Sequence, residues 1–227
     1  MTSQGVAGLA EIGGRQSLRE RVAESLRAAL VSGRMAPGTT YSIPALADQF
    51  GVSATPVREA MLDLVNEGIV APVPNKGFRV VELTDAELDQ ITELRRLLEV
   101  PTVGALAGVI DRSSIKRLRS LASAVSDAAR RGDVVAYVEA DRELHLALLA
   151  HAGNPRLVEM VGRLRDQSRL YGLEQLAAEG VLVDSANEHM QLIDALESGD
   201  RLAAERVMAH HLDHVRGIWA SRREERT

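Results

Sequence analysis

The spacing of apolar residues changes along the chain and divides the sequence into parts. In residues 18–30, apolar side chains recur every three or four positions, which predicts an amphipathic helix that Ser17 caps and Gly33 ends. The next stretch, RMAPGTTY at residues 34–41, lacks such a period and is expected to be a loop. The chain therefore begins with one helix and a connection.

A Gly-Val-Ser corner then separates two short helical patterns. Ser42 is expected to cap the first helix, which Gly51 ends. The second helix begins at Ser53 or Thr55, whose hydroxyl can accept the free amide protons of a first turn. Its apolar residues fall on one face, while Arg58 points elsewhere. A polar helix start beside a tight turn is typical of a helix-turn-helix that presents its second helix to DNA.

Beyond Gly68 the helical period stops. The segments Ile69-Val70 and Phe78-Arg79-Val80-Val81 flank a turn at Asn75-Lys76-Gly77, which predicts a β-hairpin. Three helices followed by a hairpin predict a winged helix in which the hairpin is the wing.

From Thr84 onward the pattern is helical throughout. Thr84 and Glu87 form a capping box that opens a helix running towards Ala107. Short breakers separate the further predicted helices, which cover Ser113–Arg131, Asp133–Ala152, Asn154–Tyr171, Asp184–Ser198 and Asp200–Arg222. The expected fold is mainly α, an N-terminal winged helix-turn-helix followed by an antiparallel all-α bundle of about six helices.

These patterns predict the domain organisation. Residues 1–15 are expected to form a flexible tail and residues 16–82 the DNA-binding domain. Residues 83–223 are expected to form the helical domain. The segment VELTDAE at residues 81–87 would join the two domains.

Charge and composition narrow the class of protein. The formal net charge of the 227 residues is −5, which argues against a protein that binds polyanions with its whole surface. Residues 15–82 hold eight Lys/Arg and seven Asp/Glu, so this part is only mildly basic. The sequence has no cysteine, no run long enough for a membrane span and no signal-peptide pattern. We therefore expect a cytoplasmic protein without a membrane partner.

These features, in this order, resemble those of one protein family. A winged helix with GVSATPVREAMLDLVNEGIV, joined to an all-helical part, resembles the GntR family of bacterial transcription regulators. The helical part resembles the ligand-binding FCD domain of the FadR-type branch in ELRRLLE, DRELHLALLAHAGNP and EHMQLIDALESGDRLAAERVMAHHL. The resemblance implies a homodimer on palindromic double-stranded operator DNA that responds to a small metabolite, usually an organic acid.

The resemblance assigns residues to DNA contact. Those that match the family pattern are Ser53, Thr55, Arg58, Lys76 and Gly77. Two positions depart from it: Ala54 stands where an arginine is common, and Pro44 where an arginine or polar residue is frequent. The loss of a side chain that pairs with a guanine or a phosphate affects sequence preference, not the fold.

Four residues form a candidate metal site. Asp141 and His145 lie one helical turn apart, so a carboxylate and an imidazole can converge on one ion. His189 and His211 lie on later helices, on sides that also carry apolar residues. In the resembled domain, one Asp and three His at these places bind a divalent metal. The ligand set suits zinc, nickel, manganese or iron. The alternative is a buried hydrogen-bonded network, and His210 and His214 are expected outside the set.

Arg95 in ELRRLLE has two interpretations. It can be a helix-surface charge that pairs with Glu99 at i,i+4. In the resembled family an arginine at this place faces the effector cavity, where it can hold a carboxylate.

The favoured function is a metabolite-responsive transcription regulator, acting as a repressor, whose helical domain binds a divalent metal and a small organic acid. One alternative is a metal-dependent enzyme that uses the Asp/His₃ set, but no general base is evident beside it and the winged helix would have no purpose. Another alternative is a regulator in which the metal is purely structural.

Overall fold

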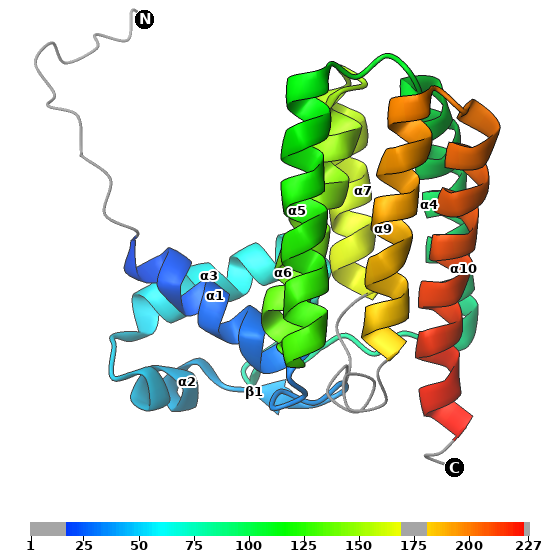
Figure 1. The fold of residues 1–227 in the computed structure, drawn as a ribbon. Helices are drawn as coiled ribbons and strands as arrows, with labels where there is room; N and C mark the ends of the chain where they lie inside the picture. The colour runs from blue at the N-terminus through cyan, green and yellow to red at the C-terminus, as the bar shows by residue number, and fades with distance from the viewer. Residues whose placement is uncertain (1–16, 169–180, 225–227) are drawn as a thin grey trace, which may run out of the picture.

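The structure is a computed structural model that describes residues 17–168 and 181–224 of the chain (Figure 1). The tail expected over residues 1–15 and the last positions of the helix predicted to end at Tyr171 lie outside these residues. No helix in the described ranges is long and apolar enough to cross a membrane.

The first part of the chain forms the predicted winged helix. Strand β3 lies between β1 and β2 and is antiparallel to both, so β2 and β3 make the expected hairpin. The elements are α1 Leu18–Val31, β1 Thr40–Tyr41, α2 Ile43–Phe50, α3 Ala54–Asn66, β2 Val70–Val73 and β3 Gly77–Val80.

The prediction of a loop over residues 34–41 is wrong at the end of this segment, where β1 forms. Thr40 pairs with Arg79, and Tyr41 pairs with Phe78. The strand has only two residues, so it shows no alternation in the sequence, and its partner lies far along the chain. The contact with β3, rather than local propensity, makes this segment extended.

The same contact explains why position 77 is a glycine. Gly77 has a φ of +126°, which disfavours any residue with a side chain. A Cβ there would lie 2.1 Å from the carbonyl oxygen of Tyr41. A side chain at this position would therefore push β1 away from β3.

Hydroxyl groups define the starts of two of the three N-terminal helices. The Oγ atom of Ser17 accepts from the Glu20 amide at 3.2 Å, and that of Ser42 accepts from the Ala45 amide at 3.4 Å. Ser53 occupies the same position before α3 but makes no side-chain capping bond. Ser53 is exposed to solvent.

The second part of the chain is the predicted helical bundle. Its helices are α4 Asp85–Leu106, α5 Arg112–Arg131, α6 Val134–Ala150, α7 Pro155–Ser168, α9 Val181–Ser198 and α10 Arg201–Glu224. Helix α5 packs on α6 and α9, α7 packs on α4 and α6, and α10 packs on α4 and α9 (Figure 1). The predicted fold class is confirmed.

Caps set the bundle's helix boundaries. The Thr84–Glu87 capping box is present, with the Thr84 amide donating to Glu87 Oε2 at 2.7 Å. Helix α5 begins at Arg112, one residue before the predicted start, because Asp111 accepts from the amides of the first turn. Asp200 caps α10, as expected, by accepting from the Ala203 amide at 2.9 Å.

The winged helix and the bundle contact each other directly. Helix α1 packs against α6, and Val31 at the end of α1 belongs to the apolar core of the bundle. The two parts are therefore connected by side-chain packing as well as by the chain between β3 and α4.

Candidate nucleic-acid interface and metal centre

Helix α3 buries one face and exposes its start. Val57, Met61 and Leu64 have no solvent-exposed surface and pack in the winged-helix core. Arg58 and Thr55 are exposed on the opposite side. This is the arrangement that the apolar spacing predicts, and it leaves the arginine able to reach a DNA groove.

The turn of the wing is exposed as well. Lys76 lies at its tip, beside Asn75, which takes a positive φ of 60°. Arg79 is also exposed, because it alternates with the buried Phe78 and Val80 on β3. The sequence analysis did not single out Arg79, although this alternation was available as a signal.

The two positions that depart from the family pattern are on the surface. Ala54 is the first residue of α3 and Pro44 lies in the first turn of α2, and both are exposed. Neither residue brings a charge or a side-chain hydrogen-bond donor to this face.

The four candidate metal ligands meet in the centre of the bundle. Asp141 and His145 come from α6, His189 from α9 and His211 from α10, and all are at most 2% exposed. One ligand atom from each lies within 4.8 Å of the others. The spacing on α6 therefore places both of its residues in one cluster, as predicted.

Distances within the cluster fit ligands of a single ion. His145 Nε2 lies 3.1 Å from His189 Nε2, which is 3.1 Å from Asp141 Oδ1. With metal–ligand distances of about 2.0–2.2 Å, neighbouring ligands of one ion lie roughly 3 Å apart. His211 Nε2 is buried and has no hydrogen-bond partner. An acceptor nitrogen in this state is costly unless a cation binds it.

Carboxylates lie behind two of the imidazoles. Glu188 Oε2 lies 2.8 Å from His211 Nδ1, and Glu99 Oε2 lies 3.3 Å from His145 Nδ1. The Glu188 carboxylate accepts a hydrogen bond from a protonated His211 Nδ1 and leaves Nε2 of His211 with its lone pair, whereas Glu99 faces His145 Nδ1 as an ion-pair partner. This is the form of histidine that binds metals.

The surroundings also favour neutral imidazoles. Burial lowers the pKa of His145 well below its ordinary value, and the charge of Arg165 lowers it further. Burial also lowers the pKa of His211, as do the neighbouring His189 and His145. The lone pairs of these two histidines are therefore not lost to protons near neutral pH.

Arg165 is a second residue that the sequence analysis missed. It lies on α7, is completely buried, and donates to Asp141 Oδ2 at 2.6 Å and to Glu99 Oε2 at 3.0 Å. These bonds hold Asp141 with its other oxygen, Oδ1, towards His189. Arg165 thus orients one candidate ligand and neutralises buried carboxylates.

Arg95 is buried rather than on the surface. It is 2% exposed, and its Nε donates to Glu99 Oε1 at 2.7 Å, so the i,i+4 pair exists inside the bundle. Burial lowers the pKa of Arg95 to about 10. Burial alone would raise the pKa of Glu99, but Arg95 and Arg165 outweigh it and hold that pKa well below its ordinary value. Both arginines retain a buried nitrogen without a hydrogen-bond partner, Arg95 Nη2 and Arg165 Nε.

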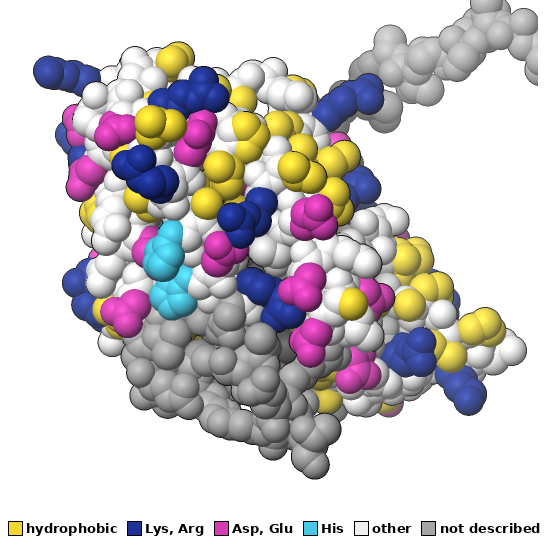
Figure 2. Space-filling view, turned by 90° about the vertical axis from the view of Figure 1, so that its right-hand side faces the viewer, with side chains coloured by type: hydrophobic (Ala, Val, Ile, Leu, Met, Phe, Trp, Pro, Cys, Tyr) yellow, Lys and Arg dark blue, Asp and Glu magenta, His cyan; other side chains and the backbone are white. Residues whose placement is uncertain are grey.

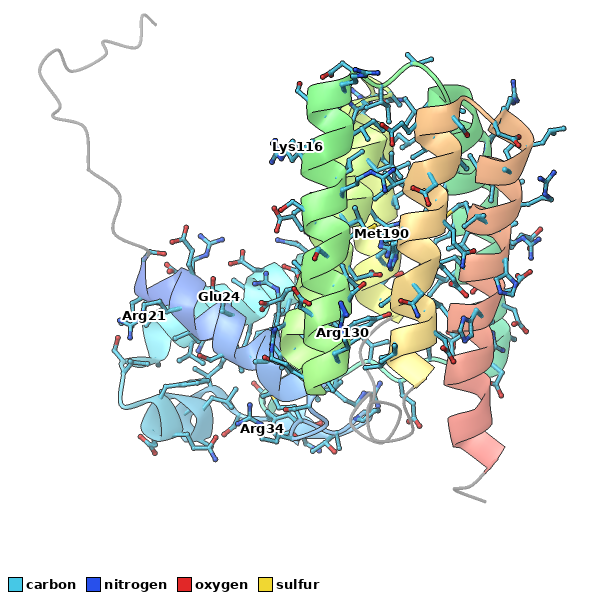
Figure 3. All side chains as sticks on the ribbon, viewed as in Figure 1. Arg21, Glu24, Arg34, Lys116, Arg130 and Met190 are labelled. Atoms are coloured by element: carbon cyan, nitrogen blue, oxygen red, sulfur yellow. The ribbon has the colours of Figure 1, made fainter. Side chains whose placement is uncertain are left out.

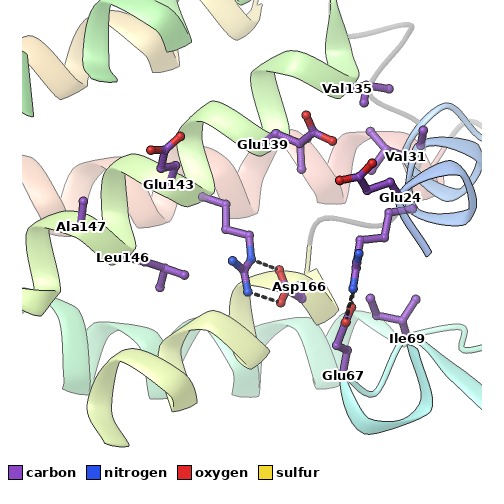
Figure 4. A pocket seen from close by; sticks show the side chains of 14 residues that line it. Glu24, Val31, Glu67, Ile69, Val135, Glu139, Glu143, Leu146, Ala147 and Asp166 are labelled. Carbon is purple, nitrogen blue, oxygen red and sulfur yellow. Dashed lines mark hydrogen bonds and ion pairs between the residues drawn. The ribbon is translucent and has the colours of Figure 1, made fainter. Parts of the chain in front are cut away.

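A cavity of about 550 Å³ lies elsewhere, between α1 and α6 (Figure 4). Two ion pairs line it: Arg27 with Glu67 in the winged helix, and Arg142 with Asp166 in the bundle. None of the clustered histidines, nor Arg95, borders this cavity. It marks the junction of the two parts of the chain, not the candidate metal centre.

Comparison with known proteins gives matches over both parts. The sequence matches the FCD domain family over residues 90–214 and the gntR family of bacterial regulatory proteins over residues 18–80. These are the families that the sequence motifs resemble.

Similar proteins are described as transcriptional regulators. The HTH-type transcriptional regulator McbR of Escherichia coli (strain K12) is 28% identical over 195 residues, which cover 85% of this chain and 88% of McbR. A probable D-xylose utilization operon transcriptional repressor of Paenarthrobacter nicotinovorans is 27% identical over 198 residues, 87% of each chain. Both relatives, like the gntR family, are described as transcriptional or regulatory proteins.

Solved structures agree with the fold. The structure of E. coli McbR/YncC aligns with a TM-score of 0.76 at 27% identity, covering 91% of this chain and 98% of that one. A GntR regulator from Rhodococcus sp. RHA1 aligns with a TM-score of 0.69 at 23% identity, covering 88% and 95%, and supports the fold alone.

The buried charge network leads to a stability prediction. Replacing Arg165 with Met should destabilise the metal-free protein by about 3–5 kcal/mol, because two carboxylates would lose their buried partner. The matched change is Arg163→Met on the same helix, where the arginine is 58% exposed and pairs with Glu159. That change should cost at most about 0.5 kcal/mol. Urea unfolding measures both, and equal losses would contradict the role of Arg165.

Proposed function

Because the chain belongs to the GntR family of bacterial regulatory proteins and carries an FCD domain, we propose that this transcriptional regulator is a repressor that senses a small organic acid at a divalent metal ion. It would bind palindromic operator DNA as a homodimer, with residues 16–82 on the DNA and residues 83–223 binding metal and effector. The observation that carries the sensing proposal is the closed cluster of Asp141, His145, His189 and His211.

DNA contact is assigned to the exposed start of α3 and to the wing. Arg58 is suited to a base edge or a phosphate, and the hydroxyls of Ser53 and Thr55 to phosphates. Lys76 would reach the backbone from the wing, while Gly77 would let the wing turn close to β1. Arg79 is a further cation on the same strand.

A dimer is supported by an apolar surface on α4. Leu94 is 48% and Leu97 is 65% exposed, and they lie one helical turn apart. A second copy packed here would bury side chains that are otherwise in water. It would also supply the second recognition helix, roughly 34 Å away for half-sites one DNA turn apart.

The donor set can hold zinc, nickel, manganese or iron, with Asp141 Oδ1 and the three histidine nitrogens as ligands. Such an ion attracts a carboxylate oxygen as an additional ligand. Arg95 Nη2 and Arg165 Nε are buried donors without hydrogen-bond partners near this cluster, and they can pair with a carboxylate. Two cations beside a metal favour a small anionic effector over an apolar one.

Effector binding would reach the DNA through the contacts between the two parts. One route is the segment at residues 81–87, which leads into α4, the helix that carries Arg95. The other is the α1–α6 contact, since α6 carries Asp141 and His145. A shift of either helix would move the winged helix relative to the bundle.

The first prediction concerns DNA. Arg58→Ala should weaken binding to operators selected from a random DNA library by about 1–3 kcal/mol, because a base or phosphate contact is lost. Lys116→Ala is the charge-matched control, since Lys116 points outward at the end of α5 far from α1 (Figure 3). The measurement is fluorescence anisotropy at fixed salt. Equal affinity of the Arg58 variant and wild type would remove Arg58 from the interface.

The second prediction concerns the metal. Chelation should lower the melting temperature, because an ion that binds only the folded chain stabilises it by mass action. His189→Ala should abolish most of that difference, whereas His151→Ala, on the exposed end of α6, should retain it. Scanning calorimetry before and after reloading with zinc, nickel, manganese or iron measures the effect. A chelation effect that persists in the His189 variant would rule out this cluster as its origin.

The third prediction concerns the effector. In the metal-loaded protein, a panel of small mono- and dicarboxylates should contain at least one that raises the melting temperature. Arg95→Met should reduce that rise, and the neighbouring Arg96→Met should not, because Arg96 is exposed and pairs with Asp213. By linkage, operator DNA must change the affinity for the same carboxylate by the factor with which the carboxylate changes operator affinity. A carboxylate whose affinity is unchanged by DNA would favour the purely structural metal.

A further inference from the structure

A second group of metal-ligating side chains lies outside the buried cluster, between α9 and α10. His210 and His214 are one helical turn apart on α10, and Glu188 on α9 faces both. His214 Nδ1 lies 2.6 Å from Glu188 Oε1, and His210 Nε2 lies 3.4 Å from the same oxygen. The proposed function does not use these three residues as ligands.

This group is open to solvent, unlike the buried cluster. The side chain of His210 is 72% exposed and that of His214 is 26% exposed, while Glu188 is 9% exposed beneath them. Figure 2 shows histidine side chains lying together at the surface, on the side of the molecule where α10 lies. A cation from solution can reach these nitrogens without opening the bundle.

The three side chains have the chemistry of a transition-metal site. Histidines four residues apart on a helix present their rings on the same side, and here the ring centroids are 6.0 Å apart. One ligand atom from each of the three residues lies within 4.8 Å of the others. Two imidazoles and one carboxylate suit zinc, nickel or copper, whereas calcium and magnesium prefer oxygen ligands alone.

Glu188 also connects this group to the buried cluster. Its second oxygen, Oε2, lies 2.8 Å from His211 Nδ1. The carboxylate thus has one oxygen towards the exposed histidines and the other towards a buried one. A ligand of an outer ion would at the same time be the hydrogen-bond acceptor that orients His211.

We propose that Glu188, His210 and His214 form a second, solvent-accessible site for a divalent transition-metal ion. Glu188 is shared between this outer site and the hydrogen bond behind His211. Its substitution therefore affects both places, whereas substitution of the two exposed histidines affects only the outer site.

The test is equilibrium dialysis of the full chain against zinc, with a purification tag that contains no histidine. The double variant H210A/H214A should bind one fewer zinc ion per chain than the wild type. The control is H151A, which removes another exposed histidine and should bind as much zinc as the wild type. H189A should keep the outer ion and lose the buried one.

The variant E188Q tests the sharing of the carboxylate. It keeps the shape of the side chain and removes its charge. We expect it to weaken zinc binding at the outer site, where Glu188 is a ligand. At the buried site, where Glu188 only orients His211, we expect the affinity for zinc to fall about 10–100-fold. The buried affinity is measured in the H210A/H214A background, with and without E188Q, so that the two sites are separated.

Two results would overturn the proposal. The first is an H210A/H214A variant that binds as much zinc as the wild type, which would leave His210, His214 and Glu188 as an ion-paired surface group. The second is an E188Q variant with unchanged zinc binding at the outer site. Neither result depends on the buried site when the outer-site binding of both variants is measured in the H189A background, which lacks the buried ion.

Discussion

The bundle is organised around buried charges that must balance one another. Asp141 and Glu99 would each cost several kcal/mol if they were buried without a partner. Arg165 contacts both of them, and Arg95 contacts Glu99 from the next turn of α4. The result is a closed ionic core that fixes α4, α6 and α7 relative to one another.

Three imidazoles complete this core. Glu188 holds His211 with its Nε2 atom towards the cluster, Glu99 lies behind His145, and Asp141 Oδ1 faces His189. A buried lone pair without a donor destabilises the folded protein. Packing of the bundle alone therefore does not explain why several acceptor atoms are gathered at one point. A cation at this point would bind the unpartnered Nε2 of His211, which is why this cluster, rather than the cavity between α1 and α6, carries the proposal of a sensing site.

The sequence is informative where local rules decide the structure. Ser17, Thr84 and Asp200 mark helix starts because capping depends on nearby residues, and the i,i+4 spacing of Asp141 and His145 places both on one side of α6. The wing follows from the change of period and its turn residues. These features can be predicted because they depend only on residues that are close together in the sequence.

Long-range contacts are harder to predict. Strand β1 exists because β3 lies beside it, and nothing within residues 34–41 indicates this partner. Arg165 was missed because an arginine in a polar helix is usually exposed. A signal was present, however: Arg165 lies on the buried stripe of α7 with Val161 and Ser168, just as Arg95 and Glu99 lie on the buried stripe of α4. A charge on an apolar stripe indicates a buried ion pair, but its partner depends on how the helices pack.

The most direct test of this account is anomalous X-ray diffraction from crystals of the full chain that were loaded with zinc in the absence of chelator. The account predicts a strong anomalous peak about 2.0–2.2 Å from Asp141 Oδ1 and from the Nε2 atoms of His145, His189 and His211. A well-ordered cluster with no anomalous peak in its centre would contradict the account. These residues would then form a hydrogen-bonded core, and the metal-dependent sensing site would be ruled out.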